Sequence, residues 1–392
     1  MSKRANSVAA DFLIDLIRCS LLGEAAPAMP SDCTPVELAQ LIRKQHLTNL
    51  VYPVFMVTPA LADLRKLLER DYLIQIPKVA NQDAENKKWL DAAEAKGLDC
   101  IPLKGYVLRQ LYPNPMMRSM SDFDVLIRNM DNPPIRPWME SMGFVFEEDD
   151  DISPHHDNYV KKPWAYMELH RHIMRVRAGR DELEANIWAR CTPEPGRKHI
   201  YRMSDEDFYI FHLLHMHKHF VEEGCGLKNV IDIFVFLRAR GETLDRVYLD
   251  NQFNALGIDR FAAYMEHLAF VLLGDIPADE DSKTVTDYLA SMGAFGSREQ
   301  HRVIEVSSGK SKNRTLNKLS FTLRRIFPSP TVLSKHYPSV MKRKFLLPFY
   351  WIANAWRVLF VKKRTFSDLK LDGIDDEKYE TASRVFTITG TK

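Results

Sequence analysis

Two aspartates separated by one phenylalanine, Asp122 and Asp124, constrain this chain more than any other feature of its sequence. They open an apolar run that continues to Ile127 and is typical of a β-strand. Because successive side chains of a strand point to opposite faces, both carboxylates are expected on one face. Two like charges held so close disfavour each other's ionisation unless a cation lies between them. Since hard divalent cations such as Mg²⁺ prefer oxygen ligands, the pattern predicts a metal site.

The composition is that of an ordinary globular protein. The chain has 392 residues, 45% hydrophobic and 27% charged, which is enough for two or three domains. The formal net charge of +2 gives little support for nucleic-acid binding, because dedicated binders concentrate basic residues on one surface. Five scattered cysteines without a Cys-x-x-Cys spacing predict reduced, structural thiols. Asp11, Asp15 and Arg18 interrupt any signal-peptide core, so we predict a cytoplasmic protein.

Helical periodicity dominates the first 96 residues. Apolar spacing predicts helices over 8–22, 35–57 and 79–96. Ser31 or Thr34 is expected to cap the second of these helices, and Gly97 to end the third.

Short strands are predicted in the middle of the chain, and long helices after it. Extended segments are expected at 99–103, 122–127, 144–146, 158–162 and 165–172. Helical periods return at 205–220, 227–240 and 253–273. Ser204 is the expected N-cap of the first of these helices, with acidic residues in its first turn.

Several motifs accompany the two aspartates in a fixed order along the chain. They are Leu103-Lys104-Gly105, Tyr112-Pro113, Arg118 four residues before Asp122, Glu168-Leu169-His170, His215-x-x-x-His219, and Gly226-Leu227-Lys228 leading to Asp232. Over roughly residues 90 to 240, this order resembles a family of uncharacterised bacterial nucleotidyltransferases within the polymerase-β-like superfamily.

The resemblance implies a fold and a reaction. The fold is α+β, with a small mixed-sheet nucleotidyltransferase core at 97–175 between an N-terminal helical region at 1–96 and a helical C-terminal domain at 176–392. The implied reaction moves a nucleoside monophosphate from a nucleoside triphosphate such as ATP to an acceptor hydroxyl or phosphate, and releases pyrophosphate. It depends on Mg²⁺ or Mn²⁺, which bridge phosphates and activate the attacking oxygen. The acceptor, whether a small molecule, sugar, peptide or protein, is left open.

The resemblance also implies roles for the acidic residues. Asp122 and Asp124 would hold the nucleotide-bound metal. Glu168 would complete a second metal site and lie near the attacking hydroxyl, as the third carboxylate of the superfamily does.

Basic residues and one glycine are expected at the nucleotide. Gly105 has no Cβ and can approach a phosphate closely, and Lys104 and Arg118 would add cationic contacts to the triphosphate. We also place His170 and His219 in the nucleotide-binding cleft.

Three alternatives remain for these motifs. An isolated Asp-x-Asp pair is commonly a surface turn, and it also marks metal-dependent transferases that use nucleotide-sugar donors. A non-catalytic nucleotide-binding module is the third alternative, although pure binding does not need a complete set of carboxylates.

Four histidines between residues 212 and 219 invite a zinc interpretation. His212, His215 and His219 would share one face of a helix. Met216, however, occupies the position where a zinc protease carries its glutamate. We therefore favour helix packing, or contact of the helical domain with a phosphate, over zinc for this cluster.

Residues 342–364 combine basic ends with an apolar middle. Pro348, Asn354 and Arg357 interrupt the apolar run, which is too broken for a membrane span. Both a packed terminal helix and an interfacial amphipathic helix in peripheral contact with a membrane fit this pattern.

Overall fold

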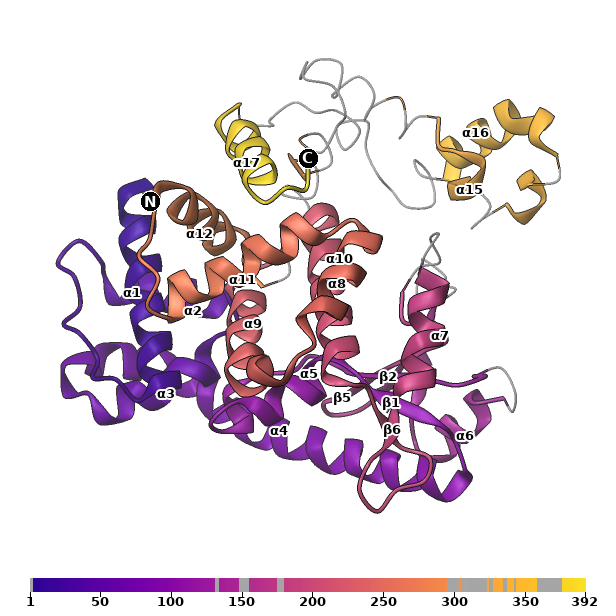
Figure 1. Cartoon of the computed structure of the whole chain (residues 1–392), viewed down its shortest axis with the longest axis horizontal. Helices are drawn as coiled ribbons and strands as arrows, with labels where there is room; N and C mark the ends of the chain where they lie inside the picture. Colours follow the sequence, from indigo (N-terminus) through magenta and orange to yellow (C-terminus); the bar gives the residue numbers. More distant parts are fainter. Residues whose placement is uncertain are drawn as a thin grey trace.

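A five-stranded mixed sheet lies among helices (Figure 1). The computed structural model describes residues 3–130, 134–147, 155–174, 180–294, 327–333, 337–341, 343–357 and 376–392, with a few single residues between 296 and 323. The sheet has the order β1 (Cys100–Pro102), β2 (Phe123–Ile127), β5 (Ala165–His170), β4 (His156–Lys161) and β3 (Val145–Glu147). Strands β2 and β5 are parallel, and the other neighbours are antiparallel. The predicted α+β class with a mixed sheet is confirmed.

The two faces of the sheet belong to different cores. Phe123 and Val125 point to the face covered by α4 (Ala62–Lys96) and α6 (Arg136–Ser141), where they pack around the fully buried Trp89. Leu126 points to the other face and joins the larger core. Figure 1 shows α4 along one side of the sheet and α8 (Asp205–Glu222) and α9 (Leu227–Arg240) on the other. The acidic side chain of β2, Asp124, therefore faces the helical half of the chain.

The N-terminal helices differ from the predicted ones in two places. They are α1 (Lys3–Leu22), α2 (Pro35–Lys44), α3 (Thr48–Val57) and α4. The single helix predicted over 35–57 is wrong, because the chain turns at His46, whose φ is +55°. The helix predicted over 79–96 is the second half of α4, which continues through Pro77. Thr34 forms a capping box, and Gly97 ends α4 with a φ of +72°, as predicted.

The second half is mainly helical. Its helices are α7 (Arg180–Arg190), α8, α9, α10 (Arg246–Leu256), α11 (Asp259–Leu273), α12 (Glu280–Met292), α15 (Pro330–Leu333), α16 (Leu347–Trp356) and α17 (Asp376–Ile388), with a small hairpin of β6 (Thr192–Pro193) and β7 (Tyr201–Arg202). Ser204 caps α8 as predicted, since its side chain accepts a hydrogen bond from the backbone of Asp207. The single helix predicted over 253–273 is wrong, because Gly257 adopts a φ of +66° and ends α10.

Short helical turns connect several of these elements. They are α5 (Lys104–Leu108) and the 3₁₀ turns Pro59–Leu61, Arg109–Leu111, Pro115–Met117, Gly241–Thr243, Pro338–Met341 and Lys344–Leu346. All five cysteines are free thiols, and four of them are buried. Within the described part of the chain, no helix is long and apolar enough to cross a membrane. The predicted domain boundaries at residues 96 and 175 stay predictions.

Candidate active site

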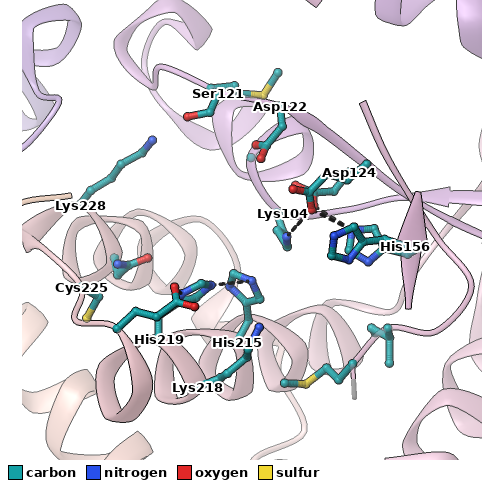
Figure 2. Close-up of a pocket in the computed structure, with 18 of the residues that line it drawn as sticks. Lys104, Ser121, Asp122, Asp124, His156, His215, Lys218, His219, Cys225 and Lys228 are labelled. Atoms are coloured by element: carbon teal, nitrogen blue, oxygen red, sulfur yellow. Dashed lines mark hydrogen bonds and ion pairs between the residues drawn. The ribbon is translucent and has the colours of Figure 1, made fainter. Parts of the chain in front are cut away.

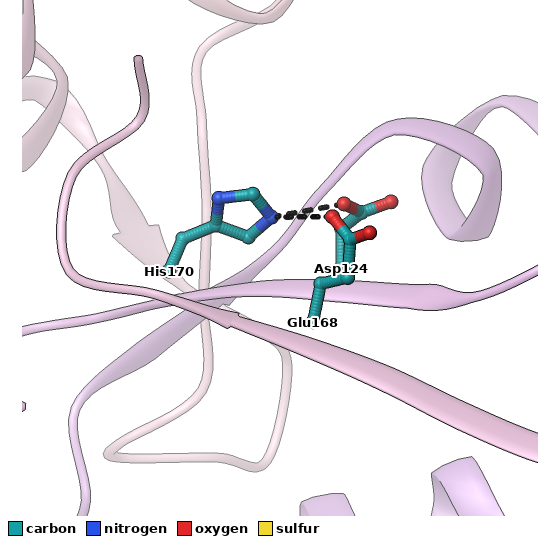
Figure 3. A group of neighbouring side chains, drawn as sticks. All are labelled: Asp124, Glu168 and His170. Carbon is teal, nitrogen blue, oxygen red and sulfur yellow. Dashed lines mark hydrogen bonds and ion pairs between the residues drawn. The ribbon is translucent and has the colours of Figure 1, made fainter. Parts of the chain in front are cut away.

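Strand pairing brings two carboxylates and one imidazole together. In the parallel pair, Asp124 of β2 lies opposite Glu168 of β5, and His170 is two residues further along the same face of β5. Their ligand atoms all lie within 4.8 Å of one another (Figure 3). His170 Nε2 is 2.9 Å from Asp124 Oδ1 and 3.4 Å from Glu168 Oε2. We call these three residues, two carboxylates and one histidine, the acidic group.

Asp122 lies beside the acidic group in the loop that leads into β2 (Figure 2). It lines the same pocket, although its carboxylate does not join the three in a common ligand set. Burial, followed by the negative charge of Asp124, raises the pKa of Asp122 to about 7. Two neighbouring carboxylates thus share a site that favours only one full negative charge, which is the conflict that a bound cation would relieve.

The side chain of Lys104 places a positive charge beside the acidic group. Its Nζ lies 2.5 Å from Asp124 Oδ1 and 3.9 Å from Glu168 Oε2. Burial opposes the charge of the ammonium, but Asp124 and Glu168 outweigh it and raise the pKa of Lys104 above its usual range. Burial likewise opposes ionisation of Asp124, but Lys104 and His170 hold the pKa of this carboxyl well below its usual range.

The backbone of Lys104 is unusual as well. Its φ is +45°, a left-handed conformation that costs energy for a residue with a Cβ. Such strain is found preferentially at functional sites, where the surrounding structure imposes it. Lys104 was expected to contact the triphosphate, and in the structure its ammonium lies between two carboxylates. Its contact with a phosphate stays a prediction.

Arg118, in the loop before β2, links this loop to α9. Its Nε and Nη2 donate to the two carboxylate oxygens of Asp232 at 2.7 and 2.8 Å, and Tyr112 Oη donates to Asp232 Oδ1 at 2.7 Å. A Cβ at Gly105 would overlap Arg118 Nη1, so the glycine makes room for this guanidinium. Two of the three guanidinium nitrogens are thus already engaged. Contact of Gly105 and Arg118 with a phosphate stays a prediction.

A pocket of about 410 Å³ separates the acidic group from a basic wall. Figure 2 shows His215, Lys218 and His219 of α8 on the far side of the pocket from Asp124, and Lys228 of α9 at its edge. His215 Nε2 and His219 Nε2 are 3.1 Å apart and share a hydrogen bond. His219, which we predicted at the nucleotide, therefore lines the pocket with a second histidine that sequence reasoning had not assigned to it.

Lys228 is held at the pocket by contacts from distant parts of the chain. Its Nζ donates to Ser119 O at 2.6 Å. The start of α9 is fixed by Gln45, whose Oε1 accepts from the backbone N–H of Leu227 at 2.9 Å and whose Nε2 donates to the carbonyls of Leu289 and Ala290. Burial, followed by the positive charge of Arg118, lowers the pKa of Lys228 to about 7. The motif Gly226-Leu227-Lys228 was a signal for this residue, but no role could be assigned to Lys228 from the motif alone.

His212 does not share the surroundings of the other histidines. It is buried and stacks on Phe208 with ring centroids 6.5 Å apart, and burial lowers its pKa to about 4. Among the described residues, the one cluster able to hold a metal is the acidic group, and it includes no histidine of α8. The geometry therefore supports packing for His212 and contact with a ligand for His215 and His219.

The match to a protein family covers this whole constellation. A family model described as uncharacterised nucleotidyltransferase matches residues 33–274, which is more than half of the chain and includes both walls of the pocket. Comparisons with curated proteins and with solved structures found no match. The match confirms the resemblance drawn from the motifs, and the chain belongs to this family of uncharacterised nucleotidyltransferases.

Proposed function

We propose that the protein transfers a nucleoside monophosphate from a nucleoside triphosphate to an acceptor hydroxyl or phosphate and releases pyrophosphate. One observation carries the proposal: the carboxylates of Asp122, Asp124 and Glu168 line one side of a pocket that carries Lys218 on its far side and Lys228 at its edge. A triphosphate with its divalent cations presents positive charge to the first side and negative charge to the second. The family match supports nucleotidyl transfer in general.

The residues of the acidic group fit a divalent cation. The ammonium of Lys104 already contacts Asp124 and Glu168, so a positive charge is accommodated there. Oxygen donors suit Mg²⁺ or Mn²⁺, and Asp122, Asp124 and Glu168 are the residues that would hold them. When bound, such a cation neutralises phosphate charge and polarises the α-phosphate. His170 hydrogen-bonds Asp124, lies 3.4 Å from a carboxylate oxygen of Glu168, and keeps both carboxylates oriented.

The transfer requires positioning and charge neutralisation rather than covalent chemistry by the protein. The acceptor oxygen attacks the α-phosphorus, and the bond between this phosphorus and the bridging oxygen to the β-phosphate breaks. For a hydroxyl acceptor, the proton passes to Glu168, whose side chain is 28% exposed and reaches the pocket, whereas Asp124 is 3% exposed. Lys218 and Lys228 stabilise the negative charge of the leaving pyrophosphate.

The proposal extends to the surroundings of the reaction. ATP is the first donor to test, and the acceptor is a small molecule, sugar, peptide or protein rather than a nucleic acid. We also propose that the reaction takes place in the cytoplasm, where the reducing conditions suit the five free thiols.

Labelled donors test the reaction directly. With ATP labelled at the α-phosphate, we expect the label on the acceptor, and with the γ-label we expect it in pyrophosphate. Asp122→Asn and Asp124→Asn should each lower turnover by about 100-fold or more. Glu147→Gln, an exposed acid at the end of β3, is the matched control and should keep full activity.

Two outcomes would contradict the proposal. Full turnover by either aspartate variant would remove the carboxylates from the reaction. Transfer of the sugar from a labelled nucleotide-sugar, without transfer from any nucleoside triphosphate, would favour the alternative of a transferase that uses a nucleotide-sugar donor.

A further inference from the structure

A long segment near the C-terminus contains basic residues and no acidic ones. Between Glu305 and Asp368, the sequence holds 14 lysines and arginines and neither aspartate nor glutamate. Because the whole chain has a formal net charge of +2, the rest of it carries −12. Such asymmetry within one chain indicates a surface that meets an anionic partner.

The described part of this segment exposes an apolar stripe. Phe345, Phe349 and Ile352 are 79%, 69% and 68% exposed. Their spacing of four and three residues places them on one side of α16 and of the turn before it. Trp356, which is 60% exposed, continues the same side one turn later. We call Phe345, Phe349 and Ile352 the α16 stripe.

The opposite side of α16 is packed, so the stripe belongs to a folded unit. Trp351 Nε1 donates to Pro328 O at 2.9 Å, and its ring contacts that of Phe327 with centroids 5.0 Å apart. Tyr350 Oη and Ser339 Oγ are hydrogen-bonded at 2.7 Å. Figure 1 shows α15 and α16 together, apart from the sheet and from α8 to α11. None of the side chains of α16 is fully buried. Packing as a terminal helix therefore accounts for one side of α16 and leaves the stripe without a partner among the described residues.

We propose that this face of α16 docks on a membrane surface with anionic headgroups. The stripe would enter the boundary between headgroups and acyl chains, while basic residues such as the exposed Arg343 would contact the headgroups. The apolar stripe distinguishes this partner from a nucleic acid, whose backbone needs basic groups but not a row of phenylalanine and isoleucine. Of the predicted segment, residues 342 and 358–364 lie outside the described residues.

The docking surface is independent of the proposed transfer reaction. Helix α16 lies outside the family match at residues 33–274 and does not line the pocket. Binding can therefore be measured on the full chain without any nucleotide. Failure of the binding test would leave the transfer reaction untouched, and failure of the reaction would leave the docking surface untouched.

Flotation of the full chain with vesicles tests the proposal. We expect the protein to float with vesicles of phosphatidylcholine mixed with phosphatidylserine, not with phosphatidylcholine alone, and less at high salt. Replacing all three stripe residues by serine should weaken binding about tenfold or more. The matched control replaces Leu73, Ile74 and Ile76 of α4, which are 55%, 45% and 41% exposed, by serine and should float like the wild type. Arg343→Glu should weaken binding about tenfold.

Circular dichroism establishes that each variant is folded, and four results would overturn the proposal. The first is that the wild type floats with neither kind of vesicle. The second is that the stripe variant and the α4 variant float equally well. The third is binding of short RNA or DNA without binding of vesicles. The fourth is a stripe variant that changes the oligomeric state in gel filtration while the wild type does not float, because the stripe would then contact a second copy.

Discussion

Removing the carboxylate of Asp232 should lower the free energy of unfolding by about 3–5 kcal/mol. Its side chain is 0% exposed and that of Arg118 is 10% exposed. At the 2.8 Å between Arg118 Nη2 and Asp232 Oδ2, and with an effective dielectric constant of about 20, the two charges attract by about 6 kcal/mol. In Asp232→Ala this attraction is lost while the guanidinium of Arg118 stays buried without its partner. Local relaxation of the fold and entry of water regain only part of the lost free energy.

Two further variants separate the pair from its neighbours. Tyr112→Phe removes one hydrogen bond to Asp232 and should cost about 1–2 kcal/mol. Replacing Asp232 by leucine and Arg118 by methionine together removes both buried charges, and should restore most of the stability lost in Asp232→Ala.

Urea titration followed by circular dichroism gives the free energies of unfolding. Glu140→Ala, which removes an exposed pair with Arg136, is the control and should cost about 1 kcal/mol or less. Two results would contradict a stabilising role for the buried pair. Either Asp232→Ala costs no more than this control, or the double variant with two apolar residues is as unstable as Asp232→Ala.

Three other predictions concern pH and packing. Affinity for nucleoside triphosphates, measured by titration calorimetry, should fall as the pH rises through about 7, because Lys228 loses its proton there, and Lys228→Met should flatten this dependence. Burial opposes ionisation of Asp232, but Arg118 outweighs it and holds the pKa of Asp232 below its usual value. The ionised Asp232 therefore contributes its full stabilisation of the fold above about pH 4, and this contribution is lost as the pH falls through the pKa of the folded state. Urea unfolding at pH 3 and at pH 6 measures the difference. A Cβ at Gly226 would overlap Gln45 Oε1 and Gly293 O, so Gly226→Ala should lower the free energy of unfolding by about 1–3 kcal/mol, as measured by thermal unfolding. Gly241→Ala is the control and should leave this free energy unchanged, because the nearest atom to a Cβ at Gly241 is 3.7 Å away.

Capping residues in the sequence predicted the helix ends that are formed by contacts within one turn. Thr34, Gly97 and Ser204 cap helices as expected, because a cap is made by residues within one turn of it. The break at Gly257 also had a local signal, since glycine adopts a positive φ at little cost, but the periodicity on both sides obscured it. The turn at His46 had none, because histidine is a poor predictor of a left-handed backbone.

Tertiary contacts explain the turn at His46, and exposure to water explains the continuous helix at Pro77. The turn at His46 ends α2 where Gln45 reaches α9 and α12, so its reason lies more than a hundred residues away. The predicted helix began at residue 79, whereas α4 begins at Ala62 and runs through Pro77. The helix continues because Leu73 and Pro77 are exposed, so water can bond the carbonyl that lacks a partner.

The site was predictable mainly on one side of the pocket, since His219 is the one residue of the other side that we expected there from the sequence. Strand alternation placed Asp122 and Asp124 on one face, and the resemblance added Glu168, which pairs opposite Asp124 through the parallel contact of β2 and β5. The basic wall depends on how α8 and α9 pack over the sheet, and no periodicity contains that information. Lys218 was therefore missed, and Lys228 was noticed only as part of a motif.

Binding of a non-cleavable ATP analogue, α,β-methylene-ATP, tests the central claim most directly. Titration calorimetry would compare the wild type, Asp124→Asn and the control Glu147→Gln, each with Mg²⁺, with Mn²⁺ and with a chelator. We predict that the wild type and the control bind the analogue tightly only when the metal is present, and that Asp124→Asn loses the dependence on metal together with most of the affinity. Equally tight binding with a chelator, or unchanged metal-dependent binding by Asp124→Asn, would contradict the account.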